Sequence, residues 1–301
     1  MEAVEKMNHN DLKTVRDNDQ DDEVDIFADA GFLFDSCQPT KQVTYTFTPS
    51  YSPANNAPDD ENAREGMPTI RISLECIDDD PGAVQSGHYV WPASPALAQY
   101  LVDTYCCSTS NDTTVGVSKI IELGCGCGLV GLCAYKIFTN SRDLVFTDHD
   151  PGTLKRAKSN FEASKEVGRP TTVFFEELKW CDDAAYFRDL FRKVSTSDVD
   201  NDIRDKQNEI GFDLVVGSDL IYCVEVVKPL IQTVSRLLSK TKKSSKMILS
   251  QSFVYDVKTE REIDDVCNEL NLLRSIVSCT LSKNGGGEGG GARIQTFTYN
   301  Q

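Results

Sequence analysis

The chain has 301 residues, of which 40% are hydrophobic, so one sizeable core can form. Its formal net charge is −16, and residues 1–35 hold eleven acidic residues against three basic ones. Because phosphate groups are bound by lysine and arginine, this balance argues against DNA or RNA as a partner. A basic protein partner is compatible with it, and so is a simple role of the acidic bias in solubility.

The cysteines and histidines indicate the cellular compartment and whether a metal site is expected. The eleven cysteines show no repeated CxxC pairs, and only three histidines are present, so we expect no metal site. The acidic N-terminus lacks the apolar run that a secretory signal needs. The sequence also has no apolar stretch of about 18 residues, the length that is needed to span a bilayer. We therefore expect a cytoplasmic protein with reduced thiols, with the nucleus as an alternative, no membrane association and a monomeric state.

The first part of the chain is predicted to precede the main domain. Residues 1–24 are polar and acidic, as is typical of a disordered tail. Residues 25–86 form an N-terminal extension, in which the alternating segments 43–51 and 69–77 predict a hairpin with a long connection. We expect the main domain over residues 87–301.

Strand-like and helical segments alternate through this main domain, which predicts an α/β fold with helices on both faces of the sheet. Helical spacing is found over residues 95–105, 129–138, 152–164, 226–239 and 260–271, and strands are expected over 118–124, 143–148, 171–180, 211–222 and 245–253.

Two segments depart from the alternation. The strands expected over 273–281 and 292–300 are joined by the glycine-rich residues 284–291, which cannot form a helix, so we predict a C-terminal antiparallel hairpin at the sheet edge. Residues 183–209 interrupt the pattern, and their polar second half is predicted to be an exposed insertion.

The strongest single motif is IIELGCGCGLVGL, residues 120–132. A strand that ends in alternating glycines and opens a helix is typical of a nucleotide-binding turn, because the backbone can approach a ligand there. Read from Gly126, the motif also fits the dinucleotide pattern GxGxxG. However, Glu122 before the turn would repel a pyrophosphate. It would instead favour S-adenosylmethionine, which carries an ammonium group and a sulfonium.

Asp148 ends the next expected strand, where a carboxylate can accept both ribose hydroxyls. The alternative is a helix N-cap, for which Asp150 is the better candidate. Cys125 and Cys127 are expected to fill the turn. A CxC metal pair or a nucleophile activated at the helix N-terminus are the two further possibilities for these thiols.

Five motifs in order resemble one family. They are VWPASPALAQYL, IIELGCGCGLVGL, LVFTDHDPGTLKRAKSNF, ELKW and FDLVVGSDLIY. Together they resemble methyltransferase family 16, the S-adenosylmethionine-dependent protein-lysine methyltransferases, over residues 88–239. The resemblance implies a Rossmann-like, seven-stranded class I methyltransferase sheet. The stretches DIFADAGFLFD and GHYVW are also similar to a branch that modifies the amino terminus and a nearby lysine of a translation elongation factor.

The resemblance implies roles for individual residues. It assigns cofactor binding to Trp91, Gly124, Cys125, Gly126, Asp148, Trp180 and Ser218, beside the Glu122 inferred above. The Asp-x-x-Tyr of SDLIY implies that Asp219 orients the incoming amine and that Tyr222 lines its passage. Stacking and cation–π contacts suit both an adenine and a sulfonium, which is consistent with the two tryptophans.

The expected activity is methyl transfer to a lysine of a protein substrate, for which the resemblance suggests a translation elongation factor or a chaperone. A small-molecule methyltransferase, or one that acts on a protein N-terminal amine, is the alternative on the same fold. A nucleic-acid methyltransferase is less favoured, because SDLIY lacks the Pro-Pro typical of those enzymes. A non-catalytic cofactor-binding scaffold and an NAD-dependent enzyme are the remaining possibilities.

Overall fold

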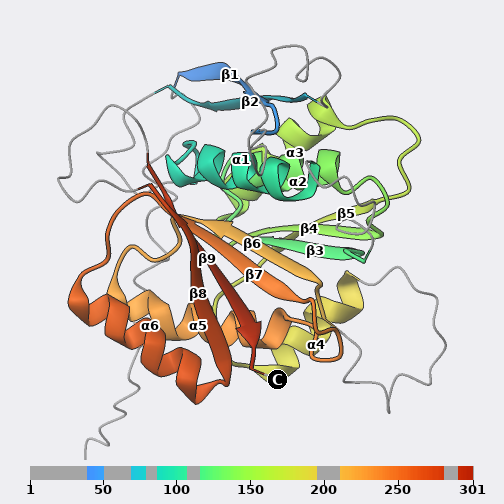
Figure 1. The fold of residues 1–301 in the computed structure, drawn as a ribbon. Coiled ribbons are helices and arrows are strands. Elements are labelled where there is room, and N and C mark those ends of the chain that lie inside the picture. Colours follow the sequence, from blue (N-terminus) through green and yellow to red (C-terminus); the bar gives the residue numbers. More distant parts are fainter. Residues whose placement is uncertain are drawn as a thin grey trace, which may run out of the picture.

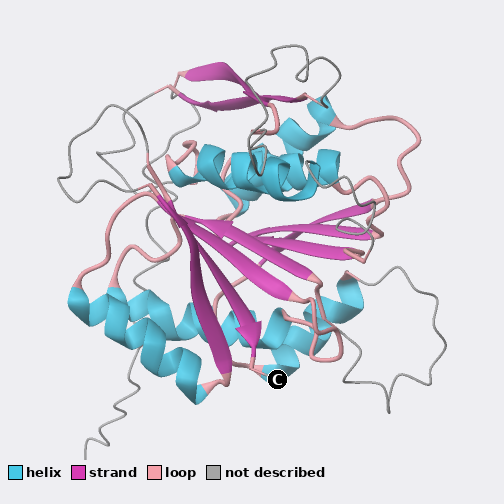
Figure 2. Cartoon of the chain, in the orientation of Figure 1, coloured by secondary structure: helices cyan, strands magenta, loops and turns pink. Residues whose placement is uncertain are grey.

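The computed structural model describes residues 39–50, 69–78, 87–106, 116–194, 211–280 and 291–300. The predicted tail of residues 1–24 and the polar second half of the insertion lie outside these ranges. A seven-stranded sheet lies between two layers of helices, and a two-stranded hairpin covers one of the layers (Figures 1 and 2).

The sheet has the order β5-β4-β3-β6-β7-β9-β8. All strands run parallel except β9, which is antiparallel to both of its neighbours. The strands are β3 (Lys119–Leu123), β4 (Asp143–Asp148), β5 (Thr172–Glu177), β6 (Leu214–Ser218), β7 (Lys246–Gln251), β8 (Leu272–Cys279) and β9 (Arg293–Tyr299). The order confirms the predicted class I methyltransferase sheet and the C-terminal antiparallel hairpin at its edge.

Helices cover both faces of the sheet (Figure 1). One layer contains α1 (Ala93–Cys106), α2 (Leu129–Ile137) and α3 (Pro151–Ser164), and the other contains α4 (Ala184–Lys193), α5 (Val227–Leu237) and α6 (Val257–Glu269). Alternate side chains of one strand serve the two layers: Ile120 lies in one hydrophobic cluster and Ile121 in the other. Among the described residues, no helix is both long and apolar enough to span a membrane.

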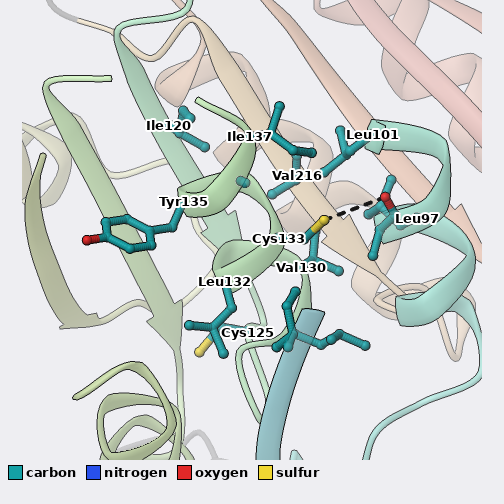
Figure 3. Packing of buried hydrophobic residues seen from close by; sticks show 14 of the residues in the cluster. Leu97, Leu101, Ile120, Cys125, Val130, Leu132, Cys133, Tyr135, Ile137 and Val216 are labelled. Carbon is teal, nitrogen blue, oxygen red and sulfur yellow. Dashed lines mark hydrogen bonds between the residues drawn. The ribbon is translucent and has the colours of Figure 1, made fainter. Parts of the chain in front are cut away.

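Helix α2 is buried on nearly all sides. Of its nine residues only Lys136 is not buried, because the helix lies against the sheet, α1 and the hairpin. Figure 3 shows Cys133 of α2 close to Leu97 and Leu101 of α1, with its thiol donating a hydrogen bond of 3.6 Å to the Ala98 carbonyl. This packing explains why the sequence after the glycine motif is so apolar.

The predicted hairpin is present as β1 (Thr40–Phe47) and β2 (Ile70–Ile77), which pair antiparallel. Its first strand begins three residues earlier than the alternation suggested. Its apolar face enters the same hydrophobic cluster as α1 and α2, through Phe47, Ile70, Ile72 and Leu74. The extension and the sheet therefore share one core.

Helix α4 corrects the prediction for residues 183–209, whose first half continues the strand–helix alternation. Asp183 caps the helix by accepting hydrogen bonds from Ala185 N (2.7 Å) and Tyr186 N (3.3 Å). Only Phe187 and Leu190 of the helix are buried. Such a narrow apolar stripe among charged residues is a weak periodic signal, and the sequence analysis missed it.

Asn160 on α3 ties the hairpin to the glycine motif. Its side chain accepts a hydrogen bond from Glu75 N (2.8 Å) and donates to the carbonyls of Glu75 (3.0 Å) and Cys127 (2.9 Å). Asn160→Ala leaves three backbone groups without their partner, the buried Cys127 carbonyl and the partly buried N–H and carbonyl of Glu75, so we expect the free energy of unfolding to fall by about 2–3 kcal/mol. Chemical denaturation measures this change. Ser164→Ala, which removes an exposed contact between the same helix and hairpin, is the control and should change it by less than about 0.5 kcal/mol. Equal effects of the two variants would contradict the role of Asn160 in linking the hairpin to the glycine motif.

Candidate active site

The glycine motif forms a tight loop between β3 and α2. Gly124, Gly126 and Gly128 have φ angles of 55°, 53° and 86°, a region that favours glycine. The loop is fixed from within and from β4: Gly128 N donates to Cys125 O (2.7 Å), and Cys125 N donates to Thr147 O (2.8 Å). The sequence prediction of a ligand-approaching turn at the end of the first parallel strand therefore has its expected geometry.

Neighbouring segments press on this loop from two sides. A Cβ atom on Gly126 would lie 3.0 Å from the Gly87 carbonyl oxygen, and one on Gly124 would lie 2.6 Å from the Leu220 side chain and 4.0 Å from the Trp180 ring. Gly124 and Gly126 remain partly accessible, whereas the cysteines that follow each of them, Cys125 and Cys127, are buried in the core. The loop thus presents bare backbone outward beside an indole ring.

Asp148 lies at the end of β4, directly against this loop. One carboxylate oxygen accepts a hydrogen bond from Gly126 N (3.1 Å), and the other accepts from Asp150 N (3.2 Å). The His149 ring also lies 3.3 Å from this carboxylate. Because a carboxylate has about four acceptor positions, Asp148 can still accept a hydrogen bond from a further hydroxyl donor. The N-cap alternative belongs to Asp150, as predicted: its carboxylate accepts from Gly152 N (2.8 Å) and Thr153 N (3.3 Å) of α3.

Asp150 is held in turn by a residue that the sequence analysis missed. The His88 ring lies 3.5 Å from the Asp150 carboxylate, and this interaction lowers the pKa of Asp150 well below its usual range. On its other side the ring accepts a hydrogen bond from Arg156 Nε (3.0 Å). The segment before α1 is thereby fixed to the beginning of α3, next to Asp148.

Glu122 does not lie on the open face of the loop. It is buried, and its carboxylate accepts a hydrogen bond from Gly131 N of α2 (3.0 Å). Burial raises its pKa well above the ordinary value of 4.5. The structure therefore places Glu122 beneath the loop, where it links β3 to α2. Glu122 would therefore affect a bound cofactor only indirectly, by holding the glycine loop in place.

A second group of polar contacts joins the ends of β6 and β7 to the start of α1. The Ser218 and Ser94 hydroxyls lie 2.7 Å apart. Ala93 is bound at both backbone groups: its N–H donates to the Asp219 carboxylate (3.0 Å), and its carbonyl accepts from the Ser250 hydroxyl (2.9 Å). Because Trp91 lies two residues earlier, these contacts fix its position relative to the same sheet edge.

Asp219 is more constrained than the sequence indicated. Besides Ala93, it accepts hydrogen bonds from the Ser252 backbone (2.7 Å) and hydroxyl (2.9 Å). Its φ of 52° is unusual for a residue other than glycine, and burial raises its pKa. The carboxylate therefore already joins three segments, and one of its acceptor positions remains.

The predicted aromatic residues lie in three places along this edge. Trp180 packs against the Gly124 loop, and Trp91 is half-buried before α1. Tyr222 is partly exposed, and the burial of part of its ring raises its pKa to about 12. Its phenol is therefore neutral at physiological pH. Leu220 lies between the two groups of contacts, against both Gly124 and Gly217.

Neither alternative for the paired thiols is supported by their surroundings. Burial raises the pKa of Cys125 and of Cys127, whereas nucleophiles and metal ligands need the thiolate. The Cys127 thiol donates to the His88 carbonyl (3.2 Å). Within the described ranges, no three Cys, His, Asp or Glu side chains gather into a possible metal site.

The burial of Glu122 predicts a pH effect on stability. Because its pKa is raised in the folded state, the folded protein binds that proton more tightly than the unfolded chain. The free energy of unfolding should therefore fall as pH rises from about 4.5 towards the folded-state pKa, and stay lower above it. Glu122→Gln keeps an acceptor for Gly131 N without ionising. We expect it to remove this decline and to melt at or above the wild-type temperature at pH 8.

Melting temperatures of the free protein between about pH 5 and pH 8 test this. Glu162→Gln, on the exposed side of α3, is the matched control and should follow the wild-type curve. Wild-type and Glu122→Gln curves that run parallel would contradict the prediction.

Comparison with known proteins identifies the family. A family model described as lysine methyltransferase matches residues 73–264. The protein N-lysine methyltransferase METTL21A of Danio rerio is 27% identical over 150 residues, which cover 50% of this chain and 55% of that protein. The chain thus matches little more than half of that relative's length.

Solved structures show only distant likeness. A ribosomal protein L11 methylase from Lactobacillus delbrueckii subsp. bulgaricus is 16% identical, with 69% of this chain and 79% of that chain covered and a TM-score of 0.40. A putative SAM-dependent methyltransferase from Streptococcus mutans is 10% identical, with 75% and 53% covered and a TM-score of 0.44. These scores are too low to support an argument, so the fold assignment rests on the sheet order itself.

S-adenosylmethionine is the cofactor of this family, and the residues present fit it. The backbone of Gly124 and Gly126 is partly accessible, the Asp148 carboxylate retains acceptor capacity for a ribose hydroxyl, and the Trp180 ring beside Gly124 offers a wall for the adenine. With more than half of its length matched by the family model and this site at its sheet edge, the chain belongs to the lysine methyltransferase family.

Proposed function

We propose that this protein transfers a methyl group from S-adenosylmethionine to the side-chain amine of a lysine in a protein substrate. The observation that supports this most is the position of two groups on one sheet edge: the Asp148–Gly126 contact at β3 and β4, and Asp219 with Tyr222 after β6. Ligands of open α/β sheets bind outside the carboxyl ends of the strands, where the strand order reverses. Here the order reverses between the neighbouring strands β3 and β6, because the chain continues from β3 to β4 on one side and from β6 to β7 on the other.

Each of the proposed cofactor-binding residues makes a different kind of contact. The loop at Gly124, Cys125 and Gly126 offers backbone groups, Asp148 accepts from the ribose, and Trp180 lies beside the adenine. Trp91, Ser218 and the more distant Glu122 complete the proposed set. When bound, S-adenosylmethionine supplies an activated methyl group on a sulfonium, so the protein's contribution is mainly to position the acceptor.

The acceptor amine must be uncharged to attack, although a free lysine has a pKa of about 10.4. Partly apolar surroundings at the sheet edge favour the neutral amine. Asp219 would orient the amine through its remaining acceptor position, and the neutral Tyr222 phenol would line the passage without adding a negative charge. A fixed carboxylate beside a neutral aromatic ring therefore suits an amine better than a phosphate.

The identity of the substrate, the cellular compartment and the oligomeric state are also proposals. The substrate would be a translation elongation factor or a chaperone, and a protein N-terminal amine or a small molecule is the second candidate acceptor. Eight cysteines between Cys76 and Cys267 are free thiols in the structure, which supports a reducing compartment, the cytoplasm or nucleus. We propose that the chain acts as a monomer without nucleic acid.

Methyl-labelled S-adenosylmethionine, mixed with the purified protein and a cell lysate, tests the proposal. We expect label in a discrete protein band, at a lysine. Asp148→Asn should abolish the label and weaken binding of S-adenosylhomocysteine roughly tenfold or more, because charge-assisted bonds to the ribose are lost. Asp143→Asn, at the opposite end of the same strand, is the matched control for binding and should not change it.

The distribution of label separates the alternatives. Label only in small molecules, or on a protein N-terminus, would replace the lysine with the second candidate acceptor. Equal cofactor affinity of the Asp148→Asn and Asp143→Asn variants would contradict the cofactor site itself.

A further inference from the structure

Two loops at the carboxyl edge of the sheet expose large apolar side chains. Tyr222 follows β6 and is 40% exposed, and Phe253, Val254 and Val257 follow β7 and are 41%, 55% and 75% exposed. We call these four residues the apolar rim. A soluble protein rarely leaves a large contiguous apolar patch in water unless the patch binds something.

Hydrogen bonds hold the two loops side by side. The backbone and hydroxyl of Ser252 both donate to Asp219, and the Gln251 side chain donates to the Ile221 carbonyl (3.4 Å). The rim residues thus flank the segment that carries the proposed catalytic Asp219. The rim is continuous with the proposed site rather than a separate surface.

The Phe253 ring makes a T-shaped contact with the Tyr255 ring, with the centroids 6.1 Å apart, but the fold does not need Val254 and Val257 to be apolar. In the stretch 253–257, Tyr255 is the buried anchor, and its hydroxyl donates to Gln251 (2.8 Å). Val257 is the first residue of α6, directly after the N-cap Asp256, and it lies outside the buried face of that helix. A polar residue would serve a helix start equally well. The exposed valine side chains are therefore better explained by a partner than by packing.

The charged side chains on the same loops indicate which kinds of side chain the partner presents to the rim. Hydrogen bonds from backbone N–H groups lower the pKa of Glu225 and of Asp256, so both exposed carboxylates are ionised at neutral pH. Lys258 is the cation close to Glu225. Arg293 also lies over the Tyr255 ring of this loop, where it is paired with Glu260. With Asp219 also at this edge, the acidic groups named here outnumber the basic ones. Such a surface complements apolar side chains accompanied by basic ones.

We propose that the apolar rim binds the segment of the protein substrate that flanks the target lysine, and that this segment carries apolar residues next to basic ones. This inference rests on the proposed protein-lysine methyltransferase function. It assigns substrate recognition to Phe253, Val254 and Val257, and it leaves cofactor binding to the glycine loop on the neighbouring strands.

The chain offers a matched control on another part of the sheet. Leu273, Ile276 and Val277 on the edge strand β8 are exposed to a similar extent, at 49%, 56% and 46%. The β9 strand separates β8 from β7, so these residues do not belong to the rim. Serine substitutions at the two sets remove a comparable amount of exposed apolar surface.

The experiment measures transfer of labelled methyl groups into lysate proteins as the lysate concentration is varied. The triple variant F253S/V254S/V257S should raise the half-saturating lysate concentration at least about tenfold. It should leave the maximal rate and the affinity for S-adenosylhomocysteine within about twofold of wild type. The variant L273S/I276S/V277S should match wild type in all three quantities. Mass spectrometry of the labelled site should show apolar and basic residues beside the modified lysine.

Equal effects of the two triple variants, or a labelled lysine surrounded by acidic residues, would overturn the inference. If F253S/V254S/V257S does not fold, the variant Glu225→Lys, at an exposed position, tests whether the negative charge near the rim contributes to substrate binding. It should raise the half-saturating concentration as well, and an unchanged value would overturn the inference. No label with wild-type protein would count against the proposed function and this inference together. Normal label with unaffected rim variants would count against the inference alone.

Discussion

The hydrogen bond from the Gly126 backbone to the Asp148 carboxylate is the contact on which the site depends. It joins the ends of β3 and β4, and it forms only because Gly126 adopts a positive φ with the Gly87 carbonyl packed where a Cβ atom would lie. The same contact places a carboxylate beside bare backbone at the start of α2. The proposed recognition of the cofactor's nucleoside at this edge rests on that juxtaposition.

The segment from Gly87 to Ser94, which leads into α1, is the second constraint, because it is attached to the sheet edge at two places. At one end, Gly87 and His88 contact the glycine loop and the start of α3. At the other end, Ala93 and Ser94 contact the ends of β6 and β7. Trp91 lies between the two attachments. A residue far from the strands in sequence is thereby brought to the proposed cofactor site, and any change at either attachment should move it.

The features that could be predicted from the sequence are those with a local physical cause. The strands and helices of the main sheet follow from hydrophobic periodicity, and the cap at Asp150 follows from its position before a helix. The glycine loop could be located because bare backbone at a strand end has few other uses. Helix α4 was missed because its buried stripe contains only Phe187 and Leu190 among charged residues.

Contacts between distant segments were not predictable. Nothing near Asp219 in the sequence indicates that Ser252 donates two hydrogen bonds to it, because that pairing depends on the parallel alignment of β6 and β7. Glu122 was expected beside the cofactor, but its hydrogen bond to Gly131 turns it under the loop. The position of α2 decides that orientation, and the motif itself does not show it.

Hydrogen exchange of the backbone amides, measured with and without S-adenosylhomocysteine, tests the central claim most directly. The claim predicts slower exchange in the bound state for Gly124–Leu129 and for the residues around Asp148, with no change at the amino ends of β3 and β4. Binding that leaves the Gly124–Leu129 amides unaffected, or that protects only another part of the chain, would contradict it.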